Sequence, residues 1–321
     1  MTPGTASTRA GGGLMLLDSA SLYFRAFFGV PTSMRASDGT PVNAVRGFLD
    51  AITGLVSARR PSRLVACWDE DWRPAFRVRA IPSYKAHRVA QGSANAEDVS
   101  DDLAVQVPLI VELLDAVGIT RAGAAGFEAD DVIGTLVARE HGRPRAQRAG
   151  TIEIVTGDRD LFQLVDDAAG VRVLYTAKGL RNLQTVDEEA LHARYGVRGG
   201  RAYADLAVLR GDPSDGLPGV RGIGEKTAAA LLGRFGTLAN LLDARDSGDP
   251  ALTPQQRRRL QESADYLAVA PVVVDVVRDA PVPELEDALP TSPADPDRLV
   301  ALAQRWGLAG PATRLVDALR A

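Results

Sequence analysis

The chain has 321 residues, of which 45% are hydrophobic and 24% are charged, and this composition excludes a wholly disordered protein. One cysteine, Cys67, and three scattered histidines exclude an intramolecular disulfide and offer no Cys/His zinc cage. The 41 acidic and 37 basic residues give a net charge of −4. This sum does not decide whether nucleic acid is a partner, because opposite charges can lie on different faces.

The length predicts about two domains at roughly 150 residues per domain. The longest apolar run near the start, Leu14 to Leu17, is far shorter than a ~20-residue membrane span or the core of a signal peptide. We therefore expect a cytoplasmic monomer with no membrane segment. Residues 1–13 are small, polar and rich in glycine, which predicts a flexible tail.

Short apolar segments alternate with amphipathic stretches in residues 14–186, a pattern typical of a mostly parallel α/β sheet. We expect strands at 14–17, 64–68, 152–155 and 171–175, and helices at 42–58, 102–117 and 130–140. Three of these strands are followed by aspartates, namely Asp18, Asp69 and Asp158. Because active sites of open α/β sheets lie beyond the carboxyl ends of the strands, these acids should lie together.

The remainder of the chain is predicted to be helical. Expected helices cover residues 187–195, 201–210, 225–235, 237–244 and 253–268, joined by Gly/Pro turns. These make a second domain at residues 187–278. The last part, residues 279–321, combines an acidic, proline-interrupted extended segment with a terminal helical piece.

Nine acids have spacings that place several carboxylates on one side of a predicted element: Asp18, Asp69, Glu128, Asp130, Asp131, Asp158, Asp160, Asp212 and Asp215. Carboxylates crowded together repel unless a cation lies among them. Mg²⁺ and Mn²⁺ prefer oxygen ligands, and paired ions of this kind hydrolyse phosphodiesters. The alternative is that each acid is a helix cap or a solvated surface charge.

Two further segments could bind phosphate. Tyr84, Lys85 and Arg88 are spaced to lie within one helical turn, as an aromatic ring beside two cations. The glycines of residues 216–227 predict a hairpin whose backbone amides lead into a helix, with Arg221 and Lys226 adding positive charge. The alternatives are a solvated basic helix and a plain helix–turn–helix.

Five motifs, taken together and in order, resemble those of the 5′-nuclease family, which includes the 5′→3′ exonuclease domain of bacterial DNA polymerase I, phage 5′ nucleases and flap endonucleases. They are Leu-Leu-Asp-Ser-Ala at 16–20, Tyr-Lys-Ala-His-Arg at 84–88, Gly-Phe-Glu-Ala-Asp-Asp at 126–131, Thr-Gly-Asp-Arg-Asp at 156–160 and Gly-Asp-Pro-Ser-Asp-Gly-Leu-Pro-Gly-Val-Arg-Gly-Ile-Gly-Glu-Lys-Thr at 211–227. The resemblance implies a PIN-like (resolvase-like) α/β domain, a helix-3-turn-helix (helix-hairpin-helix) domain and a helical arch at about residues 73–107. One departure is Gly216, where the family commonly has asparagine.

The resemblance also implies roles for individual residues. One metal site would use Asp18, Asp69, Glu128, Asp130 and Asp158, and a second would use Asp131, Asp160, Asp212 and Asp215; some family members hold a third ion. Catalytic roles fall to Lys85, Arg88, Asp130 and Asp158. The implied DNA contacts are Arg25, Arg77, Tyr84, Lys85, Arg88, Gly219, Arg221, Gly222, Gly224, Lys226 and Thr227. A K⁺ ion would be bound at the hairpin by Ser214, Val220 and Ile223.

We therefore expect a stand-alone bacterial 5′→3′ exonuclease and 5′-flap endonuclease that acts on nicked, gapped or flapped DNA and on RNA-primed DNA in replication and repair. Mg²⁺ or Mn²⁺ would be the cofactor. Two alternatives stay open, namely a PIN-type ribonuclease and a catalytically weak or inactive DNA-binding scaffold.

Overall fold

The computed structural model describes residues 12–93 and 96–321 of the chain. All but the last two residues of the predicted N-terminal tail lie outside the described residues. Within the described part, no helix is both long enough and apolar enough to cross a membrane.

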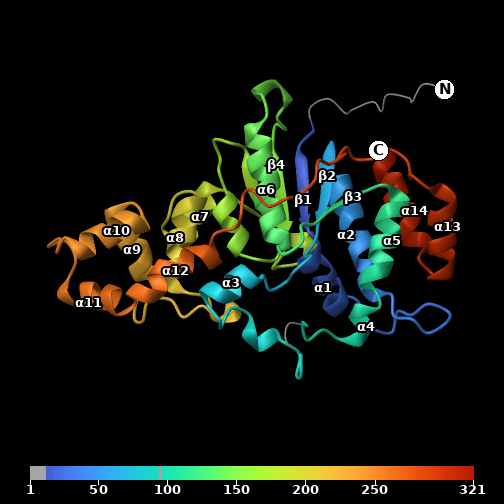
Figure 1. Cartoon of the computed structure of the whole chain (residues 1–321). Coiled ribbons are helices and arrows are strands. Elements are labelled where there is room, and N and C mark those ends of the chain that lie inside the picture. The colour runs from blue at the N-terminus through green and yellow to red at the C-terminus, as the bar shows by residue number, and fades with distance from the viewer. Residues whose placement is uncertain (1–11, 94–95) are drawn as a thin grey trace.

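A six-stranded sheet forms the centre of the first domain (Figure 1). Its spatial order is β3-β2-β1-β4-β5-β6, with all neighbours parallel except the antiparallel pair β5–β6. The strands are β1 (Leu14–Asp18), β2 (Arg63–Cys67), β3 (Thr120–Ala122), β4 (Ile152–Thr156), β5 (Val171–Tyr175) and β6 (Gln184–Val186).

The four strands expected from apolar runs are confirmed, and the mostly parallel α/β architecture with them. The sequence analysis missed β3 and β6, which have only three residues each and lie at the two edges of the sheet. Each contains a polar residue at its centre, Arg121 and Thr185, so neither shows an apolar run. Pairing with β2 and with β5, not an apolar pattern of their own, defines these two strands.

Alternate residues of the strands pack into two cores, one on each face of the sheet. Leu14 and Leu16 of β1 belong to one core, while Met15 and Leu17 belong to the other. Because both faces are covered, the central strands are apolar without alternation, as parallel sheets require.

Helices of the first domain cover both faces. They are α1 (Ser19–Gly29), α2 (Asn43–Arg59), α3 (Ala75–Ala80), α4 (Asp101–Ala104), α5 (Val107–Val117) and α6 (Ala129–Gly142). Short 3₁₀ helices are η1 (Ala86–Arg88), η2 (Arg145–Gln147), η3 (Asp160–Leu164), η4 (Leu180–Asn182) and η5 (Pro213–Asp215).

The second domain is helical, as expected. Its helices are α7 (Glu188–Tyr195), α8 (Gly200–Arg210), α9 (Glu225–Phe235), α10 (Leu238–Asp246), α11 (Pro254–Glu262) and α12 (Ala264–Val274). Local sequence explains several starts: Asp187 and Thr237 cap their helices with side-chain oxygens, and Thr253 forms a capping box before Pro254. The apolar side chains of this domain continue the core on one face of the sheet.

Two expected helices are each divided in the structure. The segment expected at 102–117 breaks between α4 and α5, and the segment expected at 253–268 breaks at Ser263 and continues to Val274.

The expected helical arch at 73–107 is also different, because its described residues before α5 contain only α3, η1 and α4, each six residues or shorter. Ile81 and Tyr84 of this segment are buried in the main core, so it packs down instead of forming a long arch.

The C-terminal residues return to the first domain. Helices α13 (Pro296–Arg305) and α14 (Ala309–Arg320) pack beside α5 and α2, at the opposite end of the molecule from α10 and α11 (Figure 1). Leu315 of α14 is fully buried in the core that includes α2 and the sheet.

This packing predicts that Leu315→Ala destabilises the protein by about 2–5 kcal/mol, because the substitution leaves a cavity in the core. Val300→Ala on α13 removes a side chain that is 54% exposed and should change the free energy of unfolding by less than ~0.5 kcal/mol. Urea unfolding of both variants would measure this. Equal effects of the two substitutions would contradict the packing.

Candidate active site

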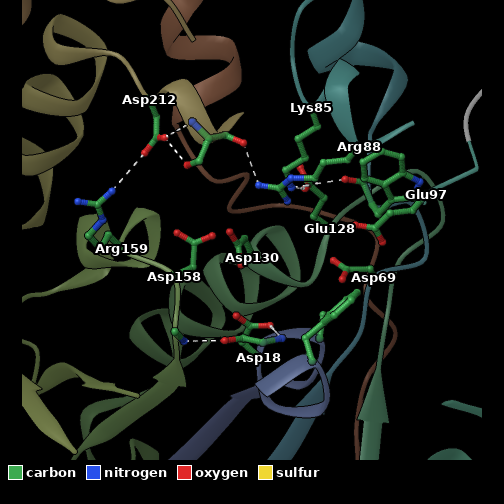
Figure 2. Close-up of a pocket in the computed structure, with 16 residues that line it drawn as sticks. Asp18, Asp69, Lys85, Arg88, Glu97, Glu128, Asp130, Asp158, Arg159 and Asp212 are labelled. Carbon is green, nitrogen blue, oxygen red and sulfur yellow. Dashed lines mark hydrogen bonds and ion pairs between the residues drawn. The ribbon is translucent and has the colours of Figure 1, made fainter. Parts of the chain in front are cut away.

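A pocket of about 350 Å³ lies at the carboxyl ends of β1, β2 and β4. In the sheet, β2 and β3 lie on one side of β1, and β4, β5 and β6 lie on the other. The carboxyl end of β1 is therefore the topological switch point of the sheet, where α/β proteins bind ligands. Six acids of the predicted set line it (Figure 2): Asp18, Asp69, Glu128, Asp130, Asp158 and Asp212.

Asp18 is the last residue of β1 and the N-cap of α1. One carboxylate oxygen accepts a hydrogen bond from the Ser21 amide at 3.0 Å, and the other accepts one from the Thr156 hydroxyl at 2.6 Å. The same hydroxyl accepts from the amide of Asp158 at 2.8 Å. Thr156, fully buried at the end of β4, therefore joins the acids at the ends of two neighbouring strands.

Three acids meet at the start of α6. Glu128 is the N-cap of this helix and Asp130 is its second residue. Asp69, two residues after β2, accepts a hydrogen bond from the amide of Ala129 at 2.7 Å. The unpaired amides and the dipole at a helix N-terminus favour negative charge, so the helix helps to gather these carboxylates.

A second group of acids adjoins the first. Asp158 accepts from the amide of Asp160 at 2.9 Å, which fixes the turn after β4. Asp212 caps η5 by accepting from the Ser214 amide at 2.8 Å, and Asp215 ends the same short helix. Asp158, Asp212 and Asp215 all raise the pKa of Asp160 through their negative charge, so these four carboxylates lie near one another.

Burial and mutual repulsion favour the neutral, protonated forms of these acids. Burial raises the pKa of Asp18 to about 6 and that of Asp69 to about 7, and neighbouring carboxylates add to both shifts. Burial and adjacent acids also raise the pKa of Asp130, Asp160 and Asp215. A cation in the pocket would reverse this by stabilising the ionised carboxylates.

Two cations already face the acids from the segment after α3. Lys85 adopts a left-handed backbone conformation (φ +47°), uncommon for a non-glycine residue, and its ammonium group contacts Glu128. Burial is the largest single influence on Lys85 and opposes its charge, but Glu128, Tyr84 and Asp215 together outweigh it, so the lysine pKa is raised. Arg88 pairs with Asp215 at 2.8 Å and donates to the carbonyl of Ser214 at 3.0 Å.

Gly216 explains how this segment is held. A Cβ at Gly216 would lie 2.1 Å from the carbonyl oxygen of Ser83, and the glycine has a φ of +75°. Ser83 donates its hydroxyl to the Gly216 carbonyl at 2.7 Å, and the Lys85 amide donates to the Asp215 carbonyl at 3.0 Å. The departure from the family pattern at this position therefore permits close contact between residues 83–85 and the turn at 212–216.

The structure corrects the prediction for Asp131. Its carboxylate is fully buried outside the pocket, where it forms a bidentate pair with Arg77 at 2.6 and 2.7 Å and accepts from the Val277 amide at 2.9 Å. With its oxygens occupied in this way, Asp131 does not face the other acids as a metal ligand.

The structure places Arg77 and Tyr84, two predicted DNA contacts, in the interior of the protein. The Arg77 guanidinium is buried between Asp131, Glu128 and the carbonyl of Val273. The Tyr84 ring is only 3% exposed, and its hydroxyl donates to Glu128 at 2.8 Å. Neither side chain has a free surface for a phosphate or a base; both instead position Glu128.

The glycine hairpin lies in the second domain, leading into α9. Gly219 and Gly222 have positive φ values, and Arg221 and Lys226 are exposed. A Cβ at Gly219 would lie 2.3 Å from the Arg210 carbonyl, so the hairpin is packed closely against the end of α8. Gly224 is the N-cap of α9, whose third residue is Thr227.

The expected K⁺ ligands are not all in one place. Val220 and Ile223 are buried within the hairpin, whereas Ser214 lines the acidic pocket and donates its hydroxyl to Asp212. Arg25, another expected DNA contact, lies beside Gly157 at the end of β4.

Sequence reasoning missed several residues that line the pocket, notably Phe24, Trp72, Glu97 and Arg159. The Arg159 guanidinium lies 3.7 Å from the Asp212 carboxylate. Its position between Asp158 and Asp160, two predicted metal ligands, could have indicated from the sequence that it lies at the site. Glu97 lies in a loop far in sequence from the acidic motifs, so nothing in the sequence indicated that it lines the pocket.

The donor chemistry fits divalent ions that prefer oxygen, since the acids share one pocket and their pKa values are raised by crowding. Among the described residues, however, no three or more His, Cys, Asp and Glu side chains are already grouped to hold an ion. Lys85, Arg88 and Arg159 pair with three of the acids instead.

The buried pair predicts that Asp131→Ala destabilises the protein by about 3–5 kcal/mol, because it removes the bidentate partner of the buried Arg77 guanidinium, which then pairs with Glu128 alone. Asp160→Ala should leave the free energy of unfolding unchanged or higher, because it removes a carboxylate that its neighbours repel. Urea unfolding in chelator measures both. A loss below ~1 kcal/mol for Asp131→Ala would refute the structural role of this residue.

The raised pKa of Asp69 predicts a pH-dependent stability in chelator. An acid whose pKa is higher in the folded state holds more protons there, so its contribution to stability falls as the pH rises from about 4 to 7. Asp69→Asn removes the titrating group. The difference in free energy of unfolding between this variant and wild type should therefore increase, in favour of the variant, by up to ~1.4 kcal/mol for each unit by which the pH rises. The exposed Asp317→Asn is the control. Urea unfolding at pH 5 and 7 measures this difference. If the free energy of unfolding of Asp69→Asn relative to wild type is the same at both pH values, the raised pKa of Asp69 is contradicted.

The chain was compared with known proteins. A family model described as the 5′–3′ exonuclease N-terminal resolvase-like domain matches residues 13–196, and another described as the 5′–3′ exonuclease C-terminal SAM fold matches residues 199–297. A 5′–3′ exonuclease of Streptomyces coelicolor is 60% identical over 96% of this chain and 100% of the relative. DNA polymerase I of Mycobacterium bovis is 37% identical over 96% of this chain, which corresponds to 32% of the polymerase.

Solved structures show the same fold. The bacteriophage T5 flap endonuclease in a pseudo-enzyme–product complex with DNA and metal ions aligns with a TM-score of 0.65 at 18% identity, covering 96% of this chain and 99% of that chain. The catalytic core of Rad2 in complex with a DNA substrate aligns with a TM-score of 0.60 at 17% identity, covering 99% and 95%. The two family models span most of the chain, and the relatives match it nearly from end to end, so this chain belongs to the 5′–3′ exonuclease family of nucleases.

Proposed function

We propose that the chain hydrolyses phosphodiesters near the junction of single-stranded and duplex DNA, both as a 5′→3′ exonuclease and as a 5′-flap endonuclease. The observation that carries this proposal is the acidic pocket faced by Lys85 and Arg88, in contact through residues 83–85 with the turn that leads into the glycine hairpin. A reacting phosphate could enter this pocket while duplex DNA lies on the hairpin.

The acids would hold the divalent ions in two groups. Asp18, Asp69, Glu128, Asp130 and Asp158 form the first group, and Asp160, Asp212 and Asp215 form the second. Bound Mg²⁺ or Mn²⁺ would supply a deprotonated water at neutral pH and stabilise negative charge on the leaving oxygen. The relatives with DNA and metal ions in their solved structures agree with this cofactor class. K⁺ at the carbonyls of Val220 and Ile223 would add positive charge to the hairpin.

The side chains of the pocket have separate tasks in this proposal. Lys85 and Arg88 now pair with Glu128 and Asp215 and would contact the phosphate oxygens once bound cations offset the charge of these acids. Arg77 and Tyr84 keep Glu128 in position throughout. The Thr156 hydroxyl and the Ser21 amide hold the Asp18 carboxylate in place, because each donates to a different oxygen.

Duplex binding would depend on shape and charge, not on base sequence. The hairpin offers backbone groups together with Arg221 and Lys226, which suit the phosphates of any sequence. The same geometry would accept an RNA-primed strand at the pocket, provided that duplex DNA lies behind it.

Cleavage of a labelled double-flap DNA in Mg²⁺, in Mn²⁺ and in chelator tests the proposal. Products at or one nucleotide beyond the junction are expected with either metal and should vanish in chelator. Asp158→Ala removes an exposed acid that has no ion pair among the described residues, and it should lower the cleavage rate at least about a hundredfold with the fold intact.

Asp317→Ala, on the distant helix α14, is the matched control and should cleave like wild type. Activity of Asp158→Ala within threefold of wild type would refute the assignment of the pocket. Flap binding without any product would favour a DNA-binding scaffold, and faster cleavage of single-stranded RNA would favour a ribonuclease.

A further inference from the structure

One arginine outside every recognised motif lies against the tip of the glycine hairpin. Arg259 is on α11, 37 residues after Gly222, and donates a hydrogen bond from Nη1 to the Gly222 carbonyl at 2.6 Å. A Cβ at Gly222 would lie 2.6 Å from the Arg259 Cζ, so the guanidinium lies directly on this backbone, whose φ of +78° at Gly222 favours glycine. The hairpin thereby holds the side chain in one place.

The charge of Arg259 is not offset by an acid. Among the described residues Arg259 has no ion pair, whereas its neighbour Arg258 pairs with Glu262 at 3.4 Å and Arg245 pairs with Asp246 at 2.7 Å. Arg221 and Lys226 on the hairpin likewise have no ion pair within that part of the chain. A guanidinium has five N–H donors, and the Gly222 carbonyl accepts from one of them.

The position of α11 agrees with a role in binding. Helix α11 lies in the lower half of the molecule in Figure 1, as does α1, whose residues Ala20, Ser21 and Phe24 line the acidic pocket. Duplex DNA running from the pocket across the hairpin would pass this side.

We propose that Arg259 is a third cation of the hairpin and contacts a phosphate of the bound duplex together with Arg221 and Lys226. This inference rests on the proposed function, because it requires duplex DNA on the hairpin. A guanidinium already held by the backbone loses little freedom on binding, and its planar fork matches a phosphate. The contact would contribute affinity without sequence preference.

The test is the affinity for a nicked duplex, measured in chelator between 50 and 200 mM NaCl. Each phosphate contact contributes about 0.9 to the slope of log affinity against log salt. Arg259→Gln should lower the slope by about this amount and weaken binding about three- to tenfold at the lower salt. Arg259→Lys should restore most of the slope.

Arg258→Gln is the matched control, since it removes an adjacent arginine of the same helix that is paired with Glu262, and it should bind like wild type. Wild-type affinity and slope in Arg259→Gln would overturn the inference. Weaker binding with an unchanged slope would also overturn it, because that result means the arginine only shapes the hairpin. If wild-type protein itself fails to bind the nicked duplex, the proposed function fails, and the two failures are thus distinguishable.

Discussion

The repulsion among carboxylates gathered at the carboxyl ends of the central strands is the constraint on which the rest of the structure depends. Parallel strands end side by side at the switch point, and the acids that follow β1, β2 and β4 therefore share one pocket. Their raised pKa values reflect the free energy needed to keep several negative charges together out of water. Cations from other parts of the chain offset this charge, and their arrangement explains much of the surrounding architecture.

Glu128 shows how groups from another segment offset the negative charge of the pocket. This one carboxylate contacts Arg77, Tyr84 and Lys85, all of which come from the segment between β2 and α4. The segment packs against the sheet, and Gly216 lets it contact the turn before the hairpin. The short contact between residues 83–85 and 212–216 thus joins the segment that carries Lys85 and Arg88 to the turn before the hairpin. The two domains share one core on this side, so the pocket and the hairpin are held in a fixed relation.

The sequence predicts where a residue lies when that position depends on the residue's own strand or turn. Asp18, Asp69 and Asp158 follow apolar runs, and their place at strand ends could be inferred from the alternation of strands and helices. It does not predict the position of a side chain that a partner distant in sequence decides. Arg77 and Tyr84 belong to a basic, aromatic segment that looks suited to DNA, yet both are buried beside Glu128. Asp131 sits next to Asp130 in sequence, but adjacent helical residues diverge by about 100°, and Asp131 faces Arg77 instead of the pocket.

The sequence by itself determined the α/β order, the central strands, most helix starts and the set of acids, because these follow from hydrophobic periodicity, capping residues and motif spacing within short stretches. Only the tertiary structure decided the edge strands, the division of the long helices, the burial of Arg77 and Asp131, and the contact between Arg259 and Gly222. Each of these depends on a partner distant in sequence. The free energy of such a contact comes from burial and charge pairing between segments, and no local pattern encodes it.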